Sequence, residues 1–409
     1  MNKSPKTING VLKKINLYSA FLLVFGMPFY KPLLPYLSFL WAFTWLLDGG
    51  PLRLSKLFVK NKFLWFFVGF FLLYLVGMLF TENQNAGWFN LEVKLSLLFF
   101  PLIMSSLNSN YEGKEQTIFK IFIGANLIAG IVCIISAVVN YYFWNYNTFF
   151  YAKLSIFHHP TYYSMYIAFS LVLVLNNIFT EKASRNKIII YTILIVVFLT
   201  LVFLLSSKAG IISAFLAVAG YLTIYLFNKR KFFSSFAIII IAGLLFFAAM
   251  NLNQRFTAIN KLSNSEKIDK NDEDSNVARL MIWKSALEVG MENLVPGVGT
   301  GDTKDVLMEK YLEKGLFNPL EKKYNAHNEF LETFVSLGFI GLLYILLLFA
   351  IPIIKAFRKK EFVALFFLLI TGLNFCFESM LNTIAGVLFF SFFYSLLVFG
   401  GRRSEGRKV

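Results

Sequence analysis

The chain has 409 residues, of which 57% are hydrophobic and 18% aromatic, whereas only 15% are charged, and its formal net charge is +16. A soluble domain carries about a quarter charged residues, so this composition excludes an ordinary soluble protein. Apolar runs of roughly 20 residues, enough to span a bilayer, recur about twelve times along the chain. The sequence therefore predicts a polytopic membrane protein. The runs lie near residues 13–30, 32–48, 62–80, 88–107, 117–144, 161–179, 187–205, 209–227, 232–250, 326–354, 361–377 and 380–400.

The basic residues of the short loops alternate along the chain. One set of loops is rich in Lys and Arg, as at Lys229-Arg230-Lys231, whereas the other set holds only Lys31, Lys153 and Lys208. Basic loop residues are retained on the cytoplasmic side of a membrane. The alternation therefore predicts cytoplasmic termini, and it accounts for the positive net charge without a nucleic-acid partner. We expect an all-α bundle of about twelve transmembrane helices.

One long polar insertion, Asn251–Asn325, interrupts the apolar pattern. The alternation of the loops places it outside the cytoplasm. Long insertions in compact proteins are usually functional or disordered. The sequence thus predicts helices 1–9 in residues 1–250, a periplasmic loop in residues 251–325, and helices 10–12 with a cytoplasmic tail in residues 326–409, all within one membrane domain.

The insertion is expected to be partly helical. Apolar residues recur at helical spacing in Val277–Leu287, which predicts an amphipathic helix. Asn293–Asp302 is rich in turn-forming residues. Asp302 could cap a second helix that runs to about Lys314. The Gly297-x-Gly299-x-Gly301 spacing within this segment does not predict a dinucleotide site, because no strand precedes it.

His327, one of three histidines in the chain, lies where the insertion meets the tenth apolar run. We expect it in the first turn of that helix, with Asn325 as the N-cap. A helix N-terminus disfavours imidazolium. A neutral imidazole beside Asn328 and Glu329 could accept a proton from a hydroxyl as a general base. An interfacial histidine that only hydrogen-bonds the loop would show the same pattern.

Two cationic positions could bind an anion. Arg279 and Lys284 lie on the predicted amphipathic helix with Trp283. A guanidinium suits bidentate phosphate binding, although a solvated helix face with an interfacial tryptophan has the same sequence pattern. Lys208 lies in a short outer turn, Ser206–Gly210, where the start of a helix could bind an anion. Snorkelling of Lys208 to the lipid head groups is the alternative.

Other titratable residues carry weaker signals. His158 and His159 are adjacent, so they do not share a face and do not predict a metal pair, but His159 could contact substrate. Lys94 lies within a span, which is a functional hint, yet its depth is shallow enough for snorkelling to the head groups. The acidic run Asp272–Asp274 reads as a solvated loop rather than a metal site. No metal or other cofactor is therefore expected.

Three short segments carry a family resemblance. They are Ser206–Gly210, then Arg279–Trp283 leading to Pro296–Gly299, and Ala326–Leu331 followed by Gly338. In these segments, and in its predicted spans and large outer loop, the chain resembles the O-antigen ligase/O-antigen polymerase superfamily of bacterial envelope glycosyltransferases. The resemblance implies a GT-C-like, metal-independent, inverting enzyme of the inner membrane. It would transfer a glycan from undecaprenyl diphosphate to an acceptor sugar hydroxyl at the periplasmic face.

The resemblance also assigns roles to residues. His327 would be the catalytic base, and Arg279 and Lys208 would hold the diphosphate. Lys208 stands where the family has arginine, and a lysine acts as a point charge rather than a planar fork. Further substrate contacts are expected at His159, Asn328, Glu329 and Lys284. Ligation of O-antigen to lipid A–core and polymerisation of repeat units both fit the pattern. A lipid-linked glycan transporter is the alternative from another class.

Overall fold

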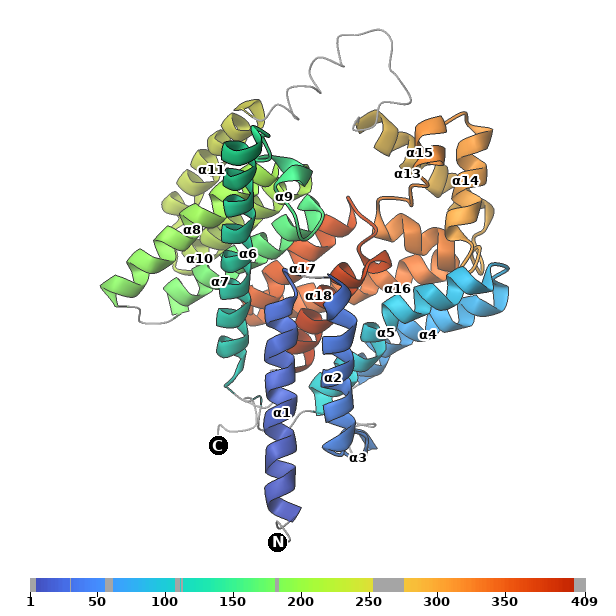
Figure 1. Ribbon diagram of the computed structural model, residues 1–409, viewed down its shortest axis with the longest axis horizontal. Helices are drawn as coiled ribbons and strands as arrows, with labels where there is room; N and C mark the ends of the chain where they lie inside the picture. Colours follow the sequence, from blue (N-terminus) through green and yellow to red (C-terminus); the bar gives the residue numbers. More distant parts are fainter. Residues whose placement is uncertain are drawn as a thin grey trace.

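The computed structural model describes residues 5–29, 31–55, 62–106, 111, 113–180, 184–252 and 276–400. Every regular element in this part of the chain is a helix (Figure 1). Seven helices among the described residues are long and apolar enough to cross a membrane by length and composition. The prediction of an all-α, polytopic membrane protein is confirmed.

Each predicted apolar run corresponds to a helix or to consecutive helices. The run near 209–227 forms α9, a π-helical turn and α10 in series, and the last run ends in a second π-helical turn. The bounds are α1 Pro5–Gly26, α2 Leu34–Leu47, α3 Gly50–Ser55, α4 Lys62–Gly77, α5 Gln84–Ser106, α6 Glu115–Trp144, α7 Pro160–Thr180, α8 Arg185–Leu205, α9 Lys208–Phe215, η4 Leu216–Gly220, α10 Tyr221–Asn228, α11 Phe232–Leu252, α16 Glu329–Lys359, α17 Phe362–Phe375, α18 Ile384–Ser395 and η6 Leu396–Gly400.

Helix α7 lies at the centre of the bundle, against α6, α8, α9 and α17. Its Phe169 ring packs on Phe122, Phe367, Phe389 and Phe393 at centroid distances of 5.9, 5.2, 5.9 and 4.9 Å. These contacts are tilted or edge-to-face, the geometry that aromatic quadrupoles favour. Within a bilayer, packing of this kind replaces the hydrophobic effect as the force that holds helices together.

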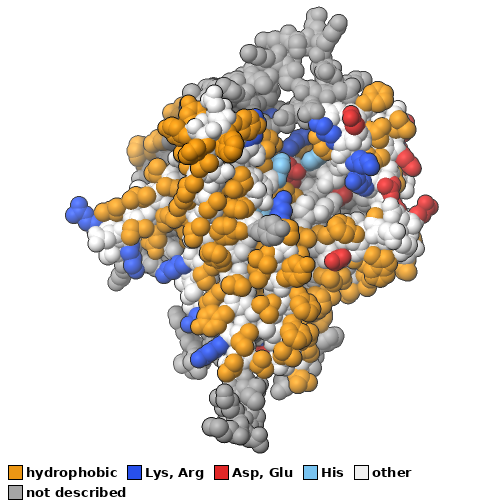
Figure 2. Space-filling model, viewed as in Figure 1, with side chains coloured by type: hydrophobic (Ala, Val, Ile, Leu, Met, Phe, Trp, Pro, Cys, Tyr) orange, Lys and Arg blue, Asp and Glu red, His pale blue; other side chains and the backbone are white. Residues whose placement is uncertain are grey.

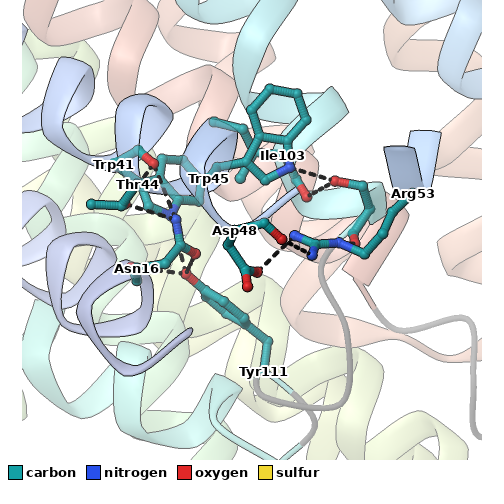
Figure 3. Close-up of polar contacts among 9 residues, drawn as sticks. Asn16, Trp41, Thr44, Trp45, Asp48, Arg53, Ile103 and Tyr111 are labelled. Atoms are coloured by element: carbon teal, nitrogen blue, oxygen red, sulfur yellow. Dashed lines mark hydrogen bonds and ion pairs between the residues drawn. The ribbon is translucent and has the colours of Figure 1, made fainter. Parts of the chain in front are cut away.

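A polar network fixes α1 and α2 near the end of the molecule where α1 begins (Figure 3). Asn16 of α1 donates to the carbonyl of Trp41 at 3.1 Å, and the hydroxyl of Tyr111 donates to Asn16 Oδ1 at 3.0 Å. The indole of Trp41 donates to that hydroxyl at 3.0 Å. Arg53 pairs with Asp48 at 2.8 Å. Buried polar groups that are satisfied in this way specify one arrangement of the helices.

The described part of the polar insertion is helical, as predicted. It contains α13 (Asn276–Glu292), α14 (Thr303–Glu313) and α15 (Phe317–Glu321). These helices gather at one corner of the molecule, at the opposite end from the beginning of α1 (Figure 1). Helix α13 packs along α16, and α14 packs on α13. The insertion is therefore joined to the membrane helices through α16.

Asp302 precedes α14, but its side chain makes no capping hydrogen bond. Asp302 is the N-cap residue of this helix and Lys314 its C-cap, as predicted, so only the side-chain bond of a cap is missing. Its carboxylate instead accepts the backbone N–H groups of Glu82 and Asn83, at 2.8 and 2.7 Å, in the loop between α4 and α5. Two charge-assisted bonds to backbone donors of another segment outweigh one local cap. Asp302 thus fastens the insertion to the membrane helices.

Helix α16 is broken at Gly338, where φ is 65°. The carbonyls of Val335 and Ser336 lose their helical partners at the break. They accept instead the N–H groups of Val298 and Gly299, at 2.9 and 3.0 Å. The glycine-rich segment of the insertion is therefore hydrogen-bonded to the carbonyl groups at the break, where a Cβ on Gly297 would meet the backbone of Ser336 and Gly338.

Replacing Gly338 with alanine is expected to lower the thermal stability of the purified protein in detergent. The residue adopts a left-handed conformation, and a Cβ would lie 2.3 Å from the carbonyl oxygen of Leu294. Backbone strain alone costs about 1–3 kcal/mol. Gly124→Ala in α6 is the matched control, because its Cβ would meet nothing within 4 Å. Equal melting temperatures for the two variants would contradict the geometry at the break.

Candidate active site

His327 lies just outside the start of α16. The N-cap of this helix is Asn328, whose side chain accepts the N–H of Leu331 at 3.1 Å. His327 precedes the cap with φ at 44°, and its own N–H donates to Asn325 Oδ1 at 3.1 Å. The prediction that Asn325 caps the helix and that His327 occupies its first turn is wrong. Asn328 caps because its extended backbone leaves its amide oxygen facing the free helical N–H groups.

The imidazole of His327 is paired with a carboxylate. Its Nδ1 lies 2.9 Å from Oε2 of Glu378, in the loop that follows α17. An ionised carboxylate only accepts hydrogen bonds, so the geometry assigns the ring hydrogen to Nδ1. Nε2 then carries the lone pair. The pair has the orientation that a histidine base requires, with a partner that fixes its tautomer.

Glu378 is a member of the candidate site that the sequence analysis missed. It lies in the short gap between the apolar runs at 361–377 and 380–400, far along the chain from His327. The available signal was one acidic residue in an otherwise apolar stretch, which is a functional hint in a membrane protein. Its side chain is 9% exposed and that of His327 is 23% exposed.

Arg279 completes the group from the insertion. Its Nη2 lies 3.3 Å from Oε1 of Glu378, and its Nη1 donates to the carbonyl of Phe377 at 3.4 Å. One turn further along α13, the indole of Trp283 donates to the carbonyl of His327 at 3.4 Å. Residues four apart share one face of a helix. The guanidinium remains 35% exposed, so it keeps donors open to a ligand.

The surroundings keep Glu378 ionised. Burial acts to raise the pKa of Glu378, but the hydrogen bond and charge of His327, together with the charges of Arg279 and His159, outweigh it and hold this pKa below its ordinary value. The carboxylate is therefore present at neutral and mildly acidic pH, available to orient His327.

The two adjacent histidines play different parts. His158 is buried, its Nε2 lies 2.8 Å from the carbonyl oxygen of Met27, and burial together with the charge of Lys31 lowers its pKa to about 4 despite that hydrogen bond. It is thus a neutral packing residue. His159 is exposed and belongs to the site electrostatically. Partial desolvation by the surrounding protein lowers the pKa of His159. The charge of Glu378 opposes this shift, whereas the charges of Arg279, His327 and Lys31 add to it.

Charged side chains of both signs gather in a hollow on the surface. Figure 2 shows histidine side chains in this hollow, close to both basic and acidic groups, between the apolar outer surface of the helices and the insertion. The predicted residues Arg279, His327 and His159 are therefore brought together, with Glu378 between them. Such a hollow could admit the charged head of a lipid while the apolar surface remains in the membrane.

Lys208 begins α9 and is half-buried. The preceding Ser207 caps this helix by accepting the N–H of Gly210 at 3.3 Å, and its hydroxyl also donates to Thr161 Oγ1 at 3.3 Å. Thr161 lies in the first turn of α7, two residues after His159. A Cβ on Gly210 would lie 2.2 Å from Ser164 Oγ, so glycine is needed for this close packing. The segment thus places Lys208 at the end of the bundle that carries the site.

The remaining predicted contacts are arranged differently. Asn328 caps α16 and also donates to the carbonyl of Cys376 at 3.2 Å. Glu329 is completely buried and accepts the N–H of Leu381 at 2.7 Å. Lys284 is exposed on α13, and its charge acts on Glu288 one turn away. Asn328 and Glu329 are therefore engaged inside the protein, whereas Lys284 faces solvent.

Lys94 of α5 points into the protein. Lys94 is only 2% exposed, so it does not snorkel to the lipid head groups, which was one of the two alternatives. It turns inward because buried carboxylates on α16 attract it. No cluster of side chains suited to a metal ion occurs among the residues that the structure describes. The acidic run Asp272–Asp274 lies outside these residues.

Comparison with known proteins supports the sequence motifs. Residues 192–346 match a family model described as O-Antigen ligase. The match includes Lys208, Arg279 and His327, whereas Glu378 and His159 lie beyond its ends. No curated protein matches the chain. This domain match supports the resemblance to the O-antigen ligase/O-antigen polymerase superfamily that the motifs predicted.

Proposed function

We propose that this protein transfers a glycan from an undecaprenyl-diphosphate-linked donor to a sugar hydroxyl, at the periplasmic face of the bacterial inner membrane. The observation that carries the proposal is the Glu378–His327 pair, 2.9 Å apart, with Arg279 beside it in a surface hollow. A base with an orienting carboxylate and a cation suits transfer between a hydroxyl and a leaving diphosphate. Ligation to lipid A–core is the preferred reaction.

In the proposed mechanism, Nε2 of His327 takes the proton of the acceptor hydroxyl. The acceptor oxygen forms a bond to the anomeric carbon as the bond from that carbon to the diphosphate oxygen breaks. The electron pair of that bond leaves with undecaprenyl diphosphate, and Arg279 and Lys208 neutralise the developing charge. In-line displacement inverts the anomeric centre. Positioning and charge stabilisation supply the rate, without metal or nucleotide.

An apolar groove offers a place for the polyprenyl chain of the donor. It has a volume of about 450 Å³ and lies between α2, α5 and α18. Its walls are mostly aromatic and aliphatic, and Ile384 at the start of α18 follows the loop that carries Glu378. The groove therefore begins near the site and continues along α2 from Pro35 to Leu46. A lipid in it would bring its diphosphate to the hollow.

The polymerase alternative shares the donor and differs in the acceptor. The glycan phenotype of a deletion strain separates the two activities. If the protein is a ligase, its deletion is expected to leave lipid A–core without polymer while polymer accumulates on the carrier lipid. If the protein is a polymerase, its deletion would instead leave single repeat units on lipid A–core. If the protein is a transporter, its deletion would leave the lipid-linked glycan on the cytoplasmic side. A transporter is disfavoured because the polar groups of the site gather at one end of the helices rather than at the bilayer midplane.

Cysteine labelling tests the proposed topology. In a full-length chain whose two native cysteines are replaced by serine, Glu321→Cys at the end of α15 is expected to react with a membrane-impermeant maleimide in intact spheroplasts. Arg358→Cys, at the other end of α16, is expected to react only after lysis. Both positions are exposed. The reverse pattern would place the site in the cytoplasm and overturn the periplasmic assignment.

The proposed diphosphate contacts predict a graded response. Lys208→Ala and Arg279→Ala are each expected to lower glycan transfer by about one to two orders of magnitude, because a hydrogen bond to a charged group contributes roughly 1.5–3 kcal/mol. Lys208→Arg keeps the charge and is expected to remain active. Lys304→Ala, at an exposed position of α14, is the matched control. Wild-type turnover by Lys208→Ala would show that this lysine does not contact the donor.

A further inference from the structure

The buried carboxylate of Glu332 joins the two loops that form the active site. Its Oε2 accepts the N–H of Ala326 at 2.9 Å and the hydroxyl of Ser379 at 3.3 Å. Ala326 immediately precedes His327, and Ser379 immediately follows Glu378. The other oxygen, Oε1, accepts from the side-chain amide of Asn382 at 2.7 Å. One carboxylate therefore holds a neighbour of each member of the catalytic pair.

Lys94 supplies the counter-charge from α5. Its Nζ donates to Oδ1 of Asn382 at 3.0 Å and lies 4.8 Å from the centre of the Tyr74 ring. Its charge interacts with both Glu332 and Glu329. An uncompensated charge within a membrane protein is costly, so ionisable groups there are paired or functional. Asn382 thus bridges the lysine and Glu332, and α5 is tied to the loop after α17.

We propose that Lys94 and Glu332 form a positioning unit that sets the distance and orientation of His327 relative to Glu378. The proposal rests on the proposed catalytic role of that pair. Neither residue needs to touch substrate, because both are almost completely buried. The backbone of His327 is held at a φ of 44°, a strained conformation that persists only when its surroundings impose it.

The bond from Ala326 to Glu332 is one of those constraints. The geometry also explains why a carboxylate is needed. All three groups that contact Glu332 are donors, and both of its oxygens are used. A glutamine would present its NH₂ group to at least one donor, so the hold on one loop would be lost. A displacement of about 1 Å at a reacting group can reduce the rate by about 100-fold.

The test measures kcat and KM for Glu332→Gln in two backgrounds. In the otherwise wild-type protein, kcat is expected to fall about ten- to a hundredfold while the KM for the donor stays within about twofold. In the His327→Ala background the same substitution is expected to cost nothing further, because a positioning residue acts only through the pair. Glu292→Gln, an exposed carboxylate paired with Lys310, is the matched control.

A second, milder variant separates a loss of positioning from a failure of Glu332→Gln to fold. Ser379→Ala removes one bond to Glu332 and leaves the buried charges in place, so a several-fold fall in kcat is expected, again only when His327 is present. Lys94→Arg, which keeps the positive charge, is expected to retain more activity than Lys94→Met. Unchanged kcat in Glu332→Gln, or an equal loss in both backgrounds, overturns the positioning role alone. Wild-type transfer by His327→Ala would overturn the proposed function and this inference with it.

Discussion

Replacing His327 with alanine is expected to lower glycan transfer by about two orders of magnitude or more, the usual contribution of a general base. The residue lies outside the helix cap with its side chain 23% exposed, so its removal opens no core cavity. Expression, membrane insertion and donor binding should therefore survive. The measurement is turnover together with donor affinity in the same purified variant.

The control for this prediction is His159→Ala. That substitution leaves the contact between His327 and Glu378 intact, so its effect is expected on KM rather than on kcat. Near-normal turnover by His327→Ala would eliminate His327 as the base. Loss of donor binding by the same variant would instead make His327 a residue that holds substrate.

The second large effect is expected for Glu378→Gln. The substitution removes the negative charge that orients the Nδ1 hydrogen of His327 and that pairs with Arg279. Loss of a charge-assisted hydrogen bond of roughly 1.5–3 kcal/mol predicts a fall in kcat of about one to two orders of magnitude. The double variant with His327→Ala should be no slower than His327→Ala alone, because the two residues act as a unit. Multiplying losses would contradict a shared role.

The same variant has a pH signature in stability. The pKa of Glu378 in the folded protein lies below its ordinary value of 4.5, because His327 and Arg279 outweigh the effect of burial. A depressed pKa stabilises the fold above the unfolded pKa, and this stabilisation is lost as pH falls through the folded pKa. The excess thermal stability of the wild type over Glu378→Gln should be full at neutral pH and shrink below about pH 4.5. A difference that grows on acidification would contradict the assigned environment.

The helices and the motifs could be predicted from the sequence because they depend on local signals. The apolar runs, the helical spacing of Val277–Leu287 and the position of Gly338 are of this kind. The role of Gly338 could be understood only from the structure, since it depends on Val298 and Gly299, which bind carbonyl groups on another element.

What could not be predicted depends on contacts between distant segments. Glu378 has no motif beside it, and its partnership with His327 arises because α16 and α17 bring two loops together. The orientation of Lys94 stayed open because depth along a span does not reveal whether a side chain faces lipid or a buried carboxylate. The side-chain partners of Asp302 could not be predicted for a related reason, since Glu82 and Asn83 lie on another loop.

The most direct test of the central claim is glycan transfer by the purified protein in detergent, with an undecaprenyl-diphosphate-linked glycan and lipid A–core supplied and excess chelator present. We expect product with inverted anomeric configuration from the wild type, and a loss of about two orders of magnitude or more in His327→Ala at unchanged donor binding. Absence of transfer by a wild-type preparation that binds donor, or equal transfer by His327→Ala, would contradict the account.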